Sequence, residues 1–332
     1  MARLDEIEFI GAGLNRPECV LTHQSGLLIT ADWTDSGGIS LVGQDGVVSR
    51  ILAKDAPRQM RPNGVALEPG GSILLADLGV EDGGVWRLHS DGHVEPVIID
   101  IAGHMLPPTN FVLRDVEERL WITVSTRRRP RSDAYRSDVA DGFIVLVKAG
   151  KARIVADNLG YTNECILSAD GAYLYVNETF ARQLSRFPLH TNGDLGEKEV
   201  FAVFGEGTFP DGLALDADGG LWVTSIVSNR VIRVSPDRHQ HLILEDVDPT
   251  HLQWVETAYS EHALGRPHLD RMTSKKLRNI SSFAFGGADL MTAHLGCLLG
   301  DSVATFRTDI AGYPPPHWST DLGSLSTISP DH

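Results

Sequence analysis

The chain is poor in cysteine and has no long apolar run. Its 332 residues include 3 Cys, at Cys19, Cys165 and Cys297, with no C-x-x-C spacing. Such a set is typical of reduced core thiols rather than of disulfides or a zinc site, and we expect a cytoplasmic protein. No apolar run reaches the roughly 18 residues of a membrane span. Residues 1–6 also lack the pattern of a signal peptide.

Positive charge is also scarce. The chain has 29 Lys and Arg against 44 Asp and Glu, which gives a formal net charge of −15. Nucleic-acid binding proteins usually show a basic stripe, so we expect no nucleic acid among the partners. An acidic surface suits solubility or the attraction of cations. We expect a monomer or homodimer that binds a small molecule and neither nucleic acid nor membrane.

What the sequence does contain is a segment that recurs six times, each with a polar residue just before a short apolar strand. We call these polar residues the phase residues. They are Glu18, Asn63, Asn110, Asn163, Asp211 and, more weakly, Ser281. Their spacings are 45, 47, 53, 48 and 70 residues, and four of the five fit the roughly 40–50 residues of a propeller blade.

Each unit continues in the same way. A turn and a second apolar run follow the phase residue, as in residues 68–77 and 216–225, and this pattern is typical of a hairpin. Third and fourth apolar runs complete a set of four short strands. Six such units predict an all-β protein, a six-bladed β-propeller, in which radial closure protects the sheet edges. We expect residues 1–332 to form this one domain.

Two segments depart from the repeat. Residues 125–136 form a basic loop in the third unit, and residues 248–278 lengthen the interval before the last unit. The second segment places apolar residues at near-helical spacing after Pro249 and Thr250, which suit a helix start. We expect a short helical insertion that acts as a lid or as a dimer contact. The insertion should border the phase residues, and the basic loop should do so only if it folds back.

The phase residues are chemically unusual for a core position. Each lies at the start of an innermost strand, so all six should converge around one end of the channel. Two carboxylates and several amides repel one another there unless a hard cation lies between them, and oxygen donors select Ca²⁺, Mg²⁺ or Mn²⁺. The alternative is that Asn or Asp before Gly only shapes turns. That alternative does not account for Glu18, Asn110 or Asn163, which no glycine follows.

Several of these motifs resemble one family. Pro17-Glu18, Asn163, Pro210-Asp211-Gly212 and the sequence at 285–290 are similar to those of the gluconolactonase, regucalcin and luciferin-regenerating-enzyme family, over roughly residues 8–310. The resemblance implies one divalent cation, Ca²⁺ first, with Zn²⁺, Mn²⁺, Mg²⁺ or Fe²⁺ as alternatives. It implies ligation by Glu18, Asn163 and Asp211, with Asn110 touching the substrate or a water on the metal.

The reaction that the resemblance implies is hydrolysis of a lactone. A divalent cation polarises the carbonyl and lowers the pKa of water, and Asp211 would double as ligand and general base. The family therefore predicts a metal-dependent lactonase. Three alternatives stay open: a paraoxonase-like esterase acting on a non-sugar lactone or ester, a strictosidine-synthase-like condensing enzyme, and a non-catalytic calcium-binding propeller. The metal could also be purely structural.

The identity of the substrate is open because of one departure. Sugar-lactone members carry an arginine two residues before the third phase residue, and this chain has Pro108 there. The run at 127–131 could supply a positive group, or it could be a solvated face. Tyr135 and Phe180 could shape a more apolar pocket. The candidate substrate residues are Asn63, Asn110, Trp33, Arg127 and His294.

Overall fold

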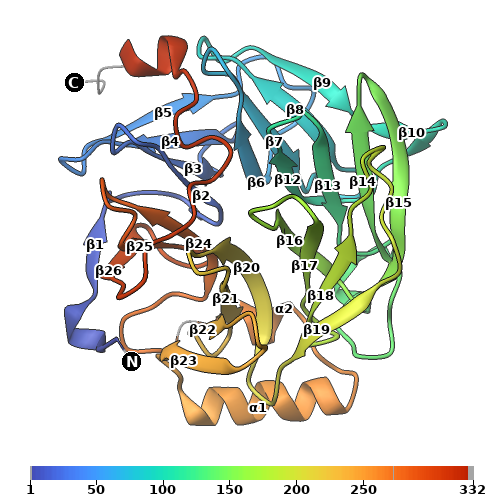
Figure 1. The fold of residues 1–332 in the computed structure, drawn as a ribbon, viewed down its shortest axis with the longest axis vertical. Helices are drawn as coiled ribbons and strands as arrows, with labels where there is room; N and C mark the ends of the chain where they lie inside the picture. Colours follow the sequence, from blue (N-terminus) through green and yellow to red (C-terminus); the bar gives the residue numbers. More distant parts are fainter. Residues whose placement is uncertain (1, 272, 328–332) are drawn as a thin grey trace.

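The computed structural model describes residues 2–271 and 273–327. Six four-stranded antiparallel sheets are arranged radially around a common axis (Figure 1). This confirms the predicted six-bladed propeller and the helical segment before its last sheet. Within the described ranges, no helix is both long and apolar enough to cross a membrane.

The first three blades follow one another along the chain. Blade 1 contains β2 (Val20–Thr22), β3 (Leu28–Asp32), β4 (Gly38–Val42) and β5 (Val48–Leu52). Blade 2 contains β6 (Pro62–Leu67), β7 (Ile73–Asp77), β8 (Gly84–Leu88) and β9 (Val94–Ile98). A small hairpin of β10 (Asp100–Ile101) and β11 (His104–Met105) leads to blade 3, which contains β12 (Thr109–Arg114), β13 (Leu120–Val124), β14 (Gly142–Lys148) and β15 (Lys151–Leu159).

The other three blades complete the circle. Blade 4 contains β16 (Thr162–Leu167), β17 (Tyr173–Glu178), β18 (Gln183–Pro188) and β19 (Glu199–Val203). Blade 5 contains β20 (Phe209–Leu215), β21 (Leu221–Ile226), β22 (Arg230–Val234) and β23 (Gln240–Leu244). Blade 6 contains β24 (Ile280–Gly286), β25 (Thr292–Cys297), β26 (Val303–Arg307) and, from the other end of the chain, β1 (Glu8–Ile10).

Blade 6 closes the propeller. Its outermost strand is β1, which pairs antiparallel with β26 so that Glu8 faces Thr305. The two ends of the propeller are thereby joined within one sheet, which leaves no gap between the first and last blades. The sequence repeat begins at Glu18 and gave no sign of this pairing. Short 3-10 helices lie at η1 (Leu4–Glu6), η2 (Arg131–Ala134) and η3 (Gly323–Thr327).

Five innermost strands are irregular at their phase residues. The pairing with the second strand shifts between Pro62 and Val65, Thr109 and Phe111, Thr162 and Cys165, Pro210 and Leu213, and Ile280 and Ser282. A β-bulge adds a residue to one strand and re-aims its side chain. The bulges therefore release the phase residues of blades 2 to 6 from the regular alternation. In blade 1, Glu18 directly precedes β2.

The glycines after two phase residues do not form turns. Gly64 lies inside β6 and Gly212 inside β20. A Cβ atom on Gly64 would come within 2.7 Å of the Phe111 Cα atom, and one on Gly212 within 2.5 Å of the Ser282 Cα atom. The alternative that Asn63 and Asp211 only shape turns is therefore wrong. Glycine is needed there because neighbouring innermost strands approach closely.

The predicted insertion contains two helices, α1 (Pro249–Ser260) and α2 (Arg266–Leu269). The Asp248 side chain caps α1 by accepting hydrogen bonds from the amides of Thr250, at 2.9 Å, and His251, at 3.2 Å. Proline follows at the first helical position, as helix starts favour. Figure 1 shows α1 at the edge of the molecule and α2 closer to the axis.

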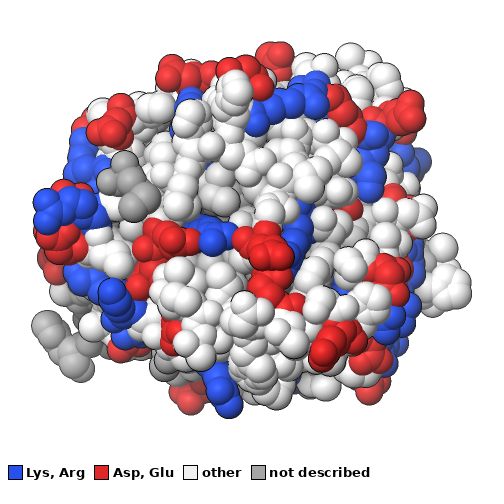
Figure 2. All heavy atoms as spheres, turned by 90° about the horizontal axis from the view of Figure 1, so that it is seen from below, with Lys and Arg blue, Asp and Glu red and all other residues white. Residues whose placement is uncertain are grey.

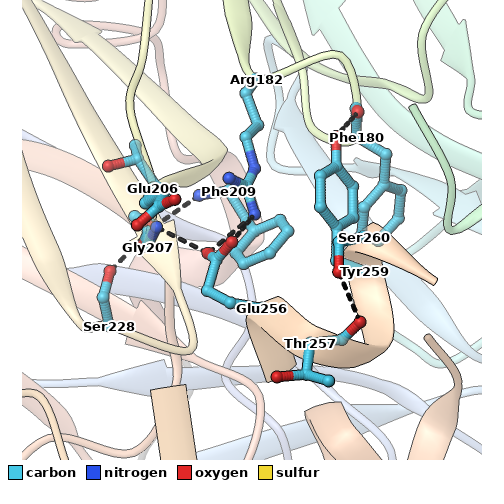
Figure 3. Close-up of polar contacts among 12 residues, drawn as sticks. Phe180, Arg182, Glu206, Gly207, Phe209, Ser228, Glu256, Thr257, Tyr259 and Ser260 are labelled. Carbon is cyan, nitrogen blue, oxygen red and sulfur yellow. Dashed lines mark hydrogen bonds and ion pairs between the residues drawn. The ribbon is translucent and has the colours of Figure 1, made fainter. Parts of the chain in front are cut away.

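An ion pair fixes α1 to blades 4 and 5. The Arg182 guanidinium contacts Glu256 at 2.7 Å and 2.8 Å, and both side chains are largely buried. Figure 3 shows the Arg182 side chain next to the Glu256 carboxylate and the Phe209 ring, whose centroid is 4.4 Å from the guanidinium carbon. The Tyr259 hydroxyl donates to the Phe180 carbonyl at 2.6 Å. The helix is thus held by charge, ring contact and hydrogen bond together.

The basic loop also lies at the end of the propeller where the phase residues lie. The loop follows β13, which runs antiparallel to β12 and ends opposite its start, since Thr109 pairs with Val124. The expectation that the loop must fold back to reach this end was wrong. It treated the loop as leaving the innermost strand, whereas a second strand returns the chain to the starting end.

Opposite charges are mixed on the surface. On the face seen in Figure 2, Lys and Arg side chains lie between Asp and Glu side chains. The net negative charge is therefore not gathered into one patch on that face. The three cysteines are all free and buried, as expected for core thiols.

Candidate metal centre and active site

Five phase residues meet in one small cavity at the end of the propeller where the innermost strands begin. Each of them is at most 4% exposed: Glu18, Asn63, Asn110, Asn163 and Asp211. The cavity volume is about 50 Å³. Because a cavity of roughly 10–15 Å³ already holds one water molecule, this space suits an ion with a few waters. A whole lactone needs more room than this.

The sixth phase residue has a supporting position instead. The Ser281 hydroxyl donates to the Glu18 carbonyl at 2.9 Å, and Ser281 does not line the cavity. The Glu18 side chain is held from the other side, because Asn63 Nδ2 donates to its Oε1 at 2.7 Å. Glu18 is therefore fixed through both its backbone and its carboxylate by neighbouring blades.

Three acceptor oxygens in the cavity are buried and have no hydrogen-bond partner among the described residues. They are Asn110 Oδ1, Asn163 Oδ1 and Asp211 Oδ1. The orientation of Asn163 is set by its other amide atom, since Nδ2 donates to Thr179 Oγ1 at 3.0 Å. Buried acceptors are almost always satisfied. A cation bound between these oxygens would satisfy them, and carboxylate and amide oxygens are the ligands that Ca²⁺ and Mg²⁺ prefer.

The two carboxylates lie in an environment that disfavours their charge. Burial raises the pKa of Glu18 to about 7, against the opposing effect of Arg16. Burial also raises the pKa of Asp211 well above its usual value, and the negative charge of Glu18 adds to this rise. No ion pair within 4 Å joins either carboxylate to a described basic side chain. A bound cation favours the ionised form of both groups.

The donor set fits a hard cation better than a soft one. Within the part of the chain that the structure describes, no three His, Cys, Asp or Glu side chains gather as a metal cluster. The possible metal ligands in the cavity are two carboxylates and several side-chain amide oxygens. Histidine and thiolate sites of the zinc type are built differently.

Arginines and tyrosines complete the lining of this cavity. The basic side chains come from three separate segments: Arg16 before β2, Arg131 in η2 and Arg266 in α2. Tyr135 and Tyr161 lie among them. Leu269 of α2 also lines the cavity, so both the insertion and the basic loop border it. Arg16 and Arg266 were missed by sequence reasoning, although Arg16 directly precedes the Pro17-Glu18 motif.

Three predicted substrate residues lie outside the cavity. Arg127 pairs with Asp157 at 2.7 Å on the exposed side of its loop. The Trp33 ring lies 4.5 Å from the Arg16 guanidinium carbon, and its indole nitrogen donates to the Pro62 carbonyl at 2.7 Å. His294 is buried in β25, where burial lowers its pKa to about 4.

A larger cavity lies further along the axis and has a different character. Its volume is about 570 Å³, and apolar residues of all six innermost strands line it together with residues 313–317. None of the phase residues contributes to it. Size alone would select this cavity as the site, but it lacks the convergent unpartnered oxygens, so we place the candidate site in the small cavity.

Comparison with curated proteins finds short regions of similarity. A 6-deoxy-6-sulfogluconolactonase of Pseudomonas putida is 34% identical over 89 residues, which is 26% of this chain and 31% of that protein. An uncharacterized protein of Sulfolobus acidocaldarius is 29% identical over 101 residues, 30% of this chain and 37% of that one. The matched regions thus span about a third of these relatives.

Solved structures match over nearly the whole chain. A luciferin-regenerating enzyme has a TM-score of 0.67 at 15% identity and covers 95% of this chain and 98% of its own. A gluconolactonase from Xanthomonas campestris has a TM-score of 0.66 at 17% identity, with coverage of 92% and 89%. Regucalcin from Agrobacterium tumefaciens, described as a calcium-binding protein, has a TM-score of 0.63 at 17% identity, with coverage of 93% and 97%.

These structural likenesses establish the fold. Membership of a family follows from a match to that family's sequence profile. The profile described as the SMP-30/Gluconolactonase/LRE-like region matches residues 80–245, half of the chain, and this stretch contains three of the five phase residues in the cavity. The protein belongs to the SMP-30/gluconolactonase/LRE-like family.

Proposed function

We propose that the protein is a lactone hydrolase that uses one divalent cation, Ca²⁺ first, held by Glu18, Asn163 and Asp211. The observation that supports this most is the set of three buried oxygens without partners, on Asn110, Asn163 and Asp211. They surround one ion-sized cavity and come from three different blades. Packing alone would place apolar side chains there.

In the proposed reaction, the cation activates the lactone and the water, and protein side chains transfer the proton and position the groups. A bound divalent cation polarises a lactone carbonyl and lowers the pKa of water. Asp211 takes the proton from the attacking water at its carboxylate, as a general base. The water oxygen adds to the carbonyl carbon, the ring C–O bond breaks, and the proton passes to the departing ring oxygen. The product is the open hydroxy acid.

The other phase residues position these groups. Asn63 fixes Glu18, and Thr179 fixes Asn163. The Asn110 side chain lines the same cavity as Glu18 and Asn163 and is suited to hold the substrate. The cap formed by Tyr135, Leu269 and their neighbours keeps bulk water away from the cavity. Low local polarity strengthens the electrostatic effects on which the reaction depends.

The relatives support lactones as the substrate class. The similar Pseudomonas protein is a 6-deoxy-6-sulfogluconolactonase, and one structural neighbour is a gluconolactonase. We propose that a lactone reaches the cavity when α2 moves outward, because about 50 Å³ does not hold it. The anchored helix α1 would remain in place. An ester without a lactone ring is the second substrate class to test, since Pro108 replaces the arginine of sugar-lactone members.

A lactone screen tests this proposal. Purified protein is assayed by pH-stat against sugar lactones, aliphatic lactones and aryl esters, each with and without EDTA. We expect turnover of at least one lactone, its loss with EDTA and its return when Ca²⁺ is added. Turnover that EDTA leaves unchanged would contradict the metal role. Tight Ca²⁺ binding without turnover of any compound would instead favour a calcium-binding propeller.

A further inference from the structure

We infer that the substrate carries an oxyanionic group in addition to the ring that opens, and that Arg131 and Arg16 bind this group. The inference rests on the proposed function for the reaction itself. It adds a substrate class, a lactone with a negatively charged substituent such as a phosphate, sulfonate or carboxylate. The site lies in the cavity, beside the phase residues.

The first observation is that Arg131 has no acidic partner in the described part of the chain. Its Nε atom is buried and forms no hydrogen bond with the described residues. The other arginines of the same loop each have an acidic partner within 4 Å: Arg127 has Asp157, Arg128 has Asp141, Arg129 has Asp82 and Arg136 has Asp138. The loop therefore uses its surface arginines for ion pairs and turns one unpaired arginine inward.

Arg16, which lines the same cavity, also has no acidic partner among the described residues. Its Nε atom is also buried without a partner, and its guanidinium lies 4.5 Å from the Trp33 ring centroid. Its backbone adopts φ 57°, in the left-handed region that disfavours side chains other than those of Gly, Asn and Asp. Strained residues of this kind gather at functional sites. The Trp33 contact and a long hydrogen bond from Arg16 Nη1 to the Leu298 carbonyl, at 3.5 Å, hold the guanidinium at the cavity.

With a divalent cation bound, the cavity would carry more positive than negative charge. A divalent cation neutralises the carboxylates of Glu18 and Asp211. Arg266 is neutralised by Asp270, with which it forms an ion pair. Among the residues that line the cavity, Arg16 and Arg131 then remain as two positive charges without an ion-pair partner in a water-poor space, which is costly unless an anion joins them.

The pKa of Tyr135 also indicates a positive electrostatic potential in this cavity. Burial alone would raise the pKa of Tyr135, but Arg131 and Arg266 lower it below its usual value. Arg16 and Arg131 act on Glu18 and Asp211 only at longer range, because no described guanidinium lies within 4 Å of either carboxylate. Guanidinium groups match the geometry of oxyanions and bind them with paired hydrogen bonds.

A binding experiment separates this inference from catalysis. The protein with saturating Ca²⁺ is titrated calorimetrically with gluconate and with 6-phosphogluconate, which differ by one phosphate. We expect the phosphorylated acid to bind more tightly, and Arg131→Gln to weaken it by roughly 10- to 100-fold, the value of a charge-assisted hydrogen bond. The affinity for gluconate should change by less than about threefold.

Arg129→Gln is the matched control, because it removes an exposed arginine of the same loop that pairs with Asp82. It should leave both affinities unchanged. If Arg131→Gln does not fold, as judged by thermal melting, Arg16→Gln tests the same claim. Equal affinity of the parent protein for the two acids, or a phosphate preference that survives both variants, would overturn the inference. Since the titration needs no turnover, a protein that hydrolyses no lactone yet shows this preference would defeat the proposed function alone.

Discussion

Asn63 donates a hydrogen bond to Glu18 across the boundary between blades 1 and 2, with 2.7 Å between Nδ2 and Oε1. The same nitrogen lies 3.1 Å from the Asn110 carbonyl of blade 3. One amide thus ties together the starts of three innermost strands. We predicted Asn63 as a substrate residue, but its contacts suit it to hold a metal ligand in place.

Asn63→Ala should therefore weaken metal binding without removing a proposed ligand. Residues that orient a ligand typically affect metal affinity by about 10- to 100-fold. We expect a loss of this order in the Ca²⁺ affinity, measured by calorimetry. Asn192→Ala, at an exposed turn, is the control and should leave the affinity unchanged. Unaltered Ca²⁺ binding by Asn63→Ala would show that Glu18 needs no such support.

Asp211→Asn should nearly abolish turnover while the fold persists. The amide keeps one oxygen for the cation but cannot accept a proton, and loss of a general base typically costs about 10²–10⁴-fold in rate. Steady-state kinetics on the best lactone measures the effect, and circular dichroism checks the fold. A kcat close to that of the parent protein would assign the base to another group.

The sequence predicts the repeat and the phase residues because both depend on local chemistry. Turn residues, apolar runs and the polar side chain before each innermost strand recur at a fixed spacing. The pairing of β1 with β26 was not predictable in this way, since one short strand has no repeat around it. The bulges were also missed, because the residues that form them differ from blade to blade.

The rest of the cavity depends on contacts between distant segments. Arg16, Arg131 and Arg266 come from three separate segments of the chain, which meet only when the propeller closes. The sequence placed Arg127 near the substrate, although Asp157 binds it at the surface. Neighbouring arginines of one loop look alike in sequence, and only the fold shows which one turns inward.

Glu256→Gln should destabilise the protein. The change leaves the Arg182 charge without its partner between Phe209 and Tyr259, and breaking a buried pair costs roughly 3–5 kcal/mol. Arg307→Gln breaks an exposed pair with Asp289, which should cost about 1 kcal/mol or less. Urea unfolding of both variants measures the difference. Similar losses in the two would mean that the Arg182–Glu256 pair does not anchor α1.

Leu269→Ala should change substrate selectivity. Leu269 closes the cavity from α2, and a smaller side chain leaves space for bulkier lactones. A few carbon atoms in a pocket typically alter selectivity by roughly 10-fold or more. We expect kcat/KM to rise for bulky lactones relative to small ones. Leu242→Ala, on the exposed side of β23, is the control. If parent and variant rank the lactones identically by kcat/KM, α2 does not determine which lactones the protein accepts.

Anomalous scattering from a crystal grown with Mn²⁺ tests the central claim most directly. Mn²⁺ takes the same oxygen ligands as Ca²⁺ and gives a strong anomalous signal. We predict one peak enclosed by the side-chain oxygens of Glu18, Asn163 and Asp211, with Asn110 beside it. The peak should vanish in a crystal treated with EDTA. A map with no peak between these side chains, or with its main peak elsewhere on the molecule, would contradict the account.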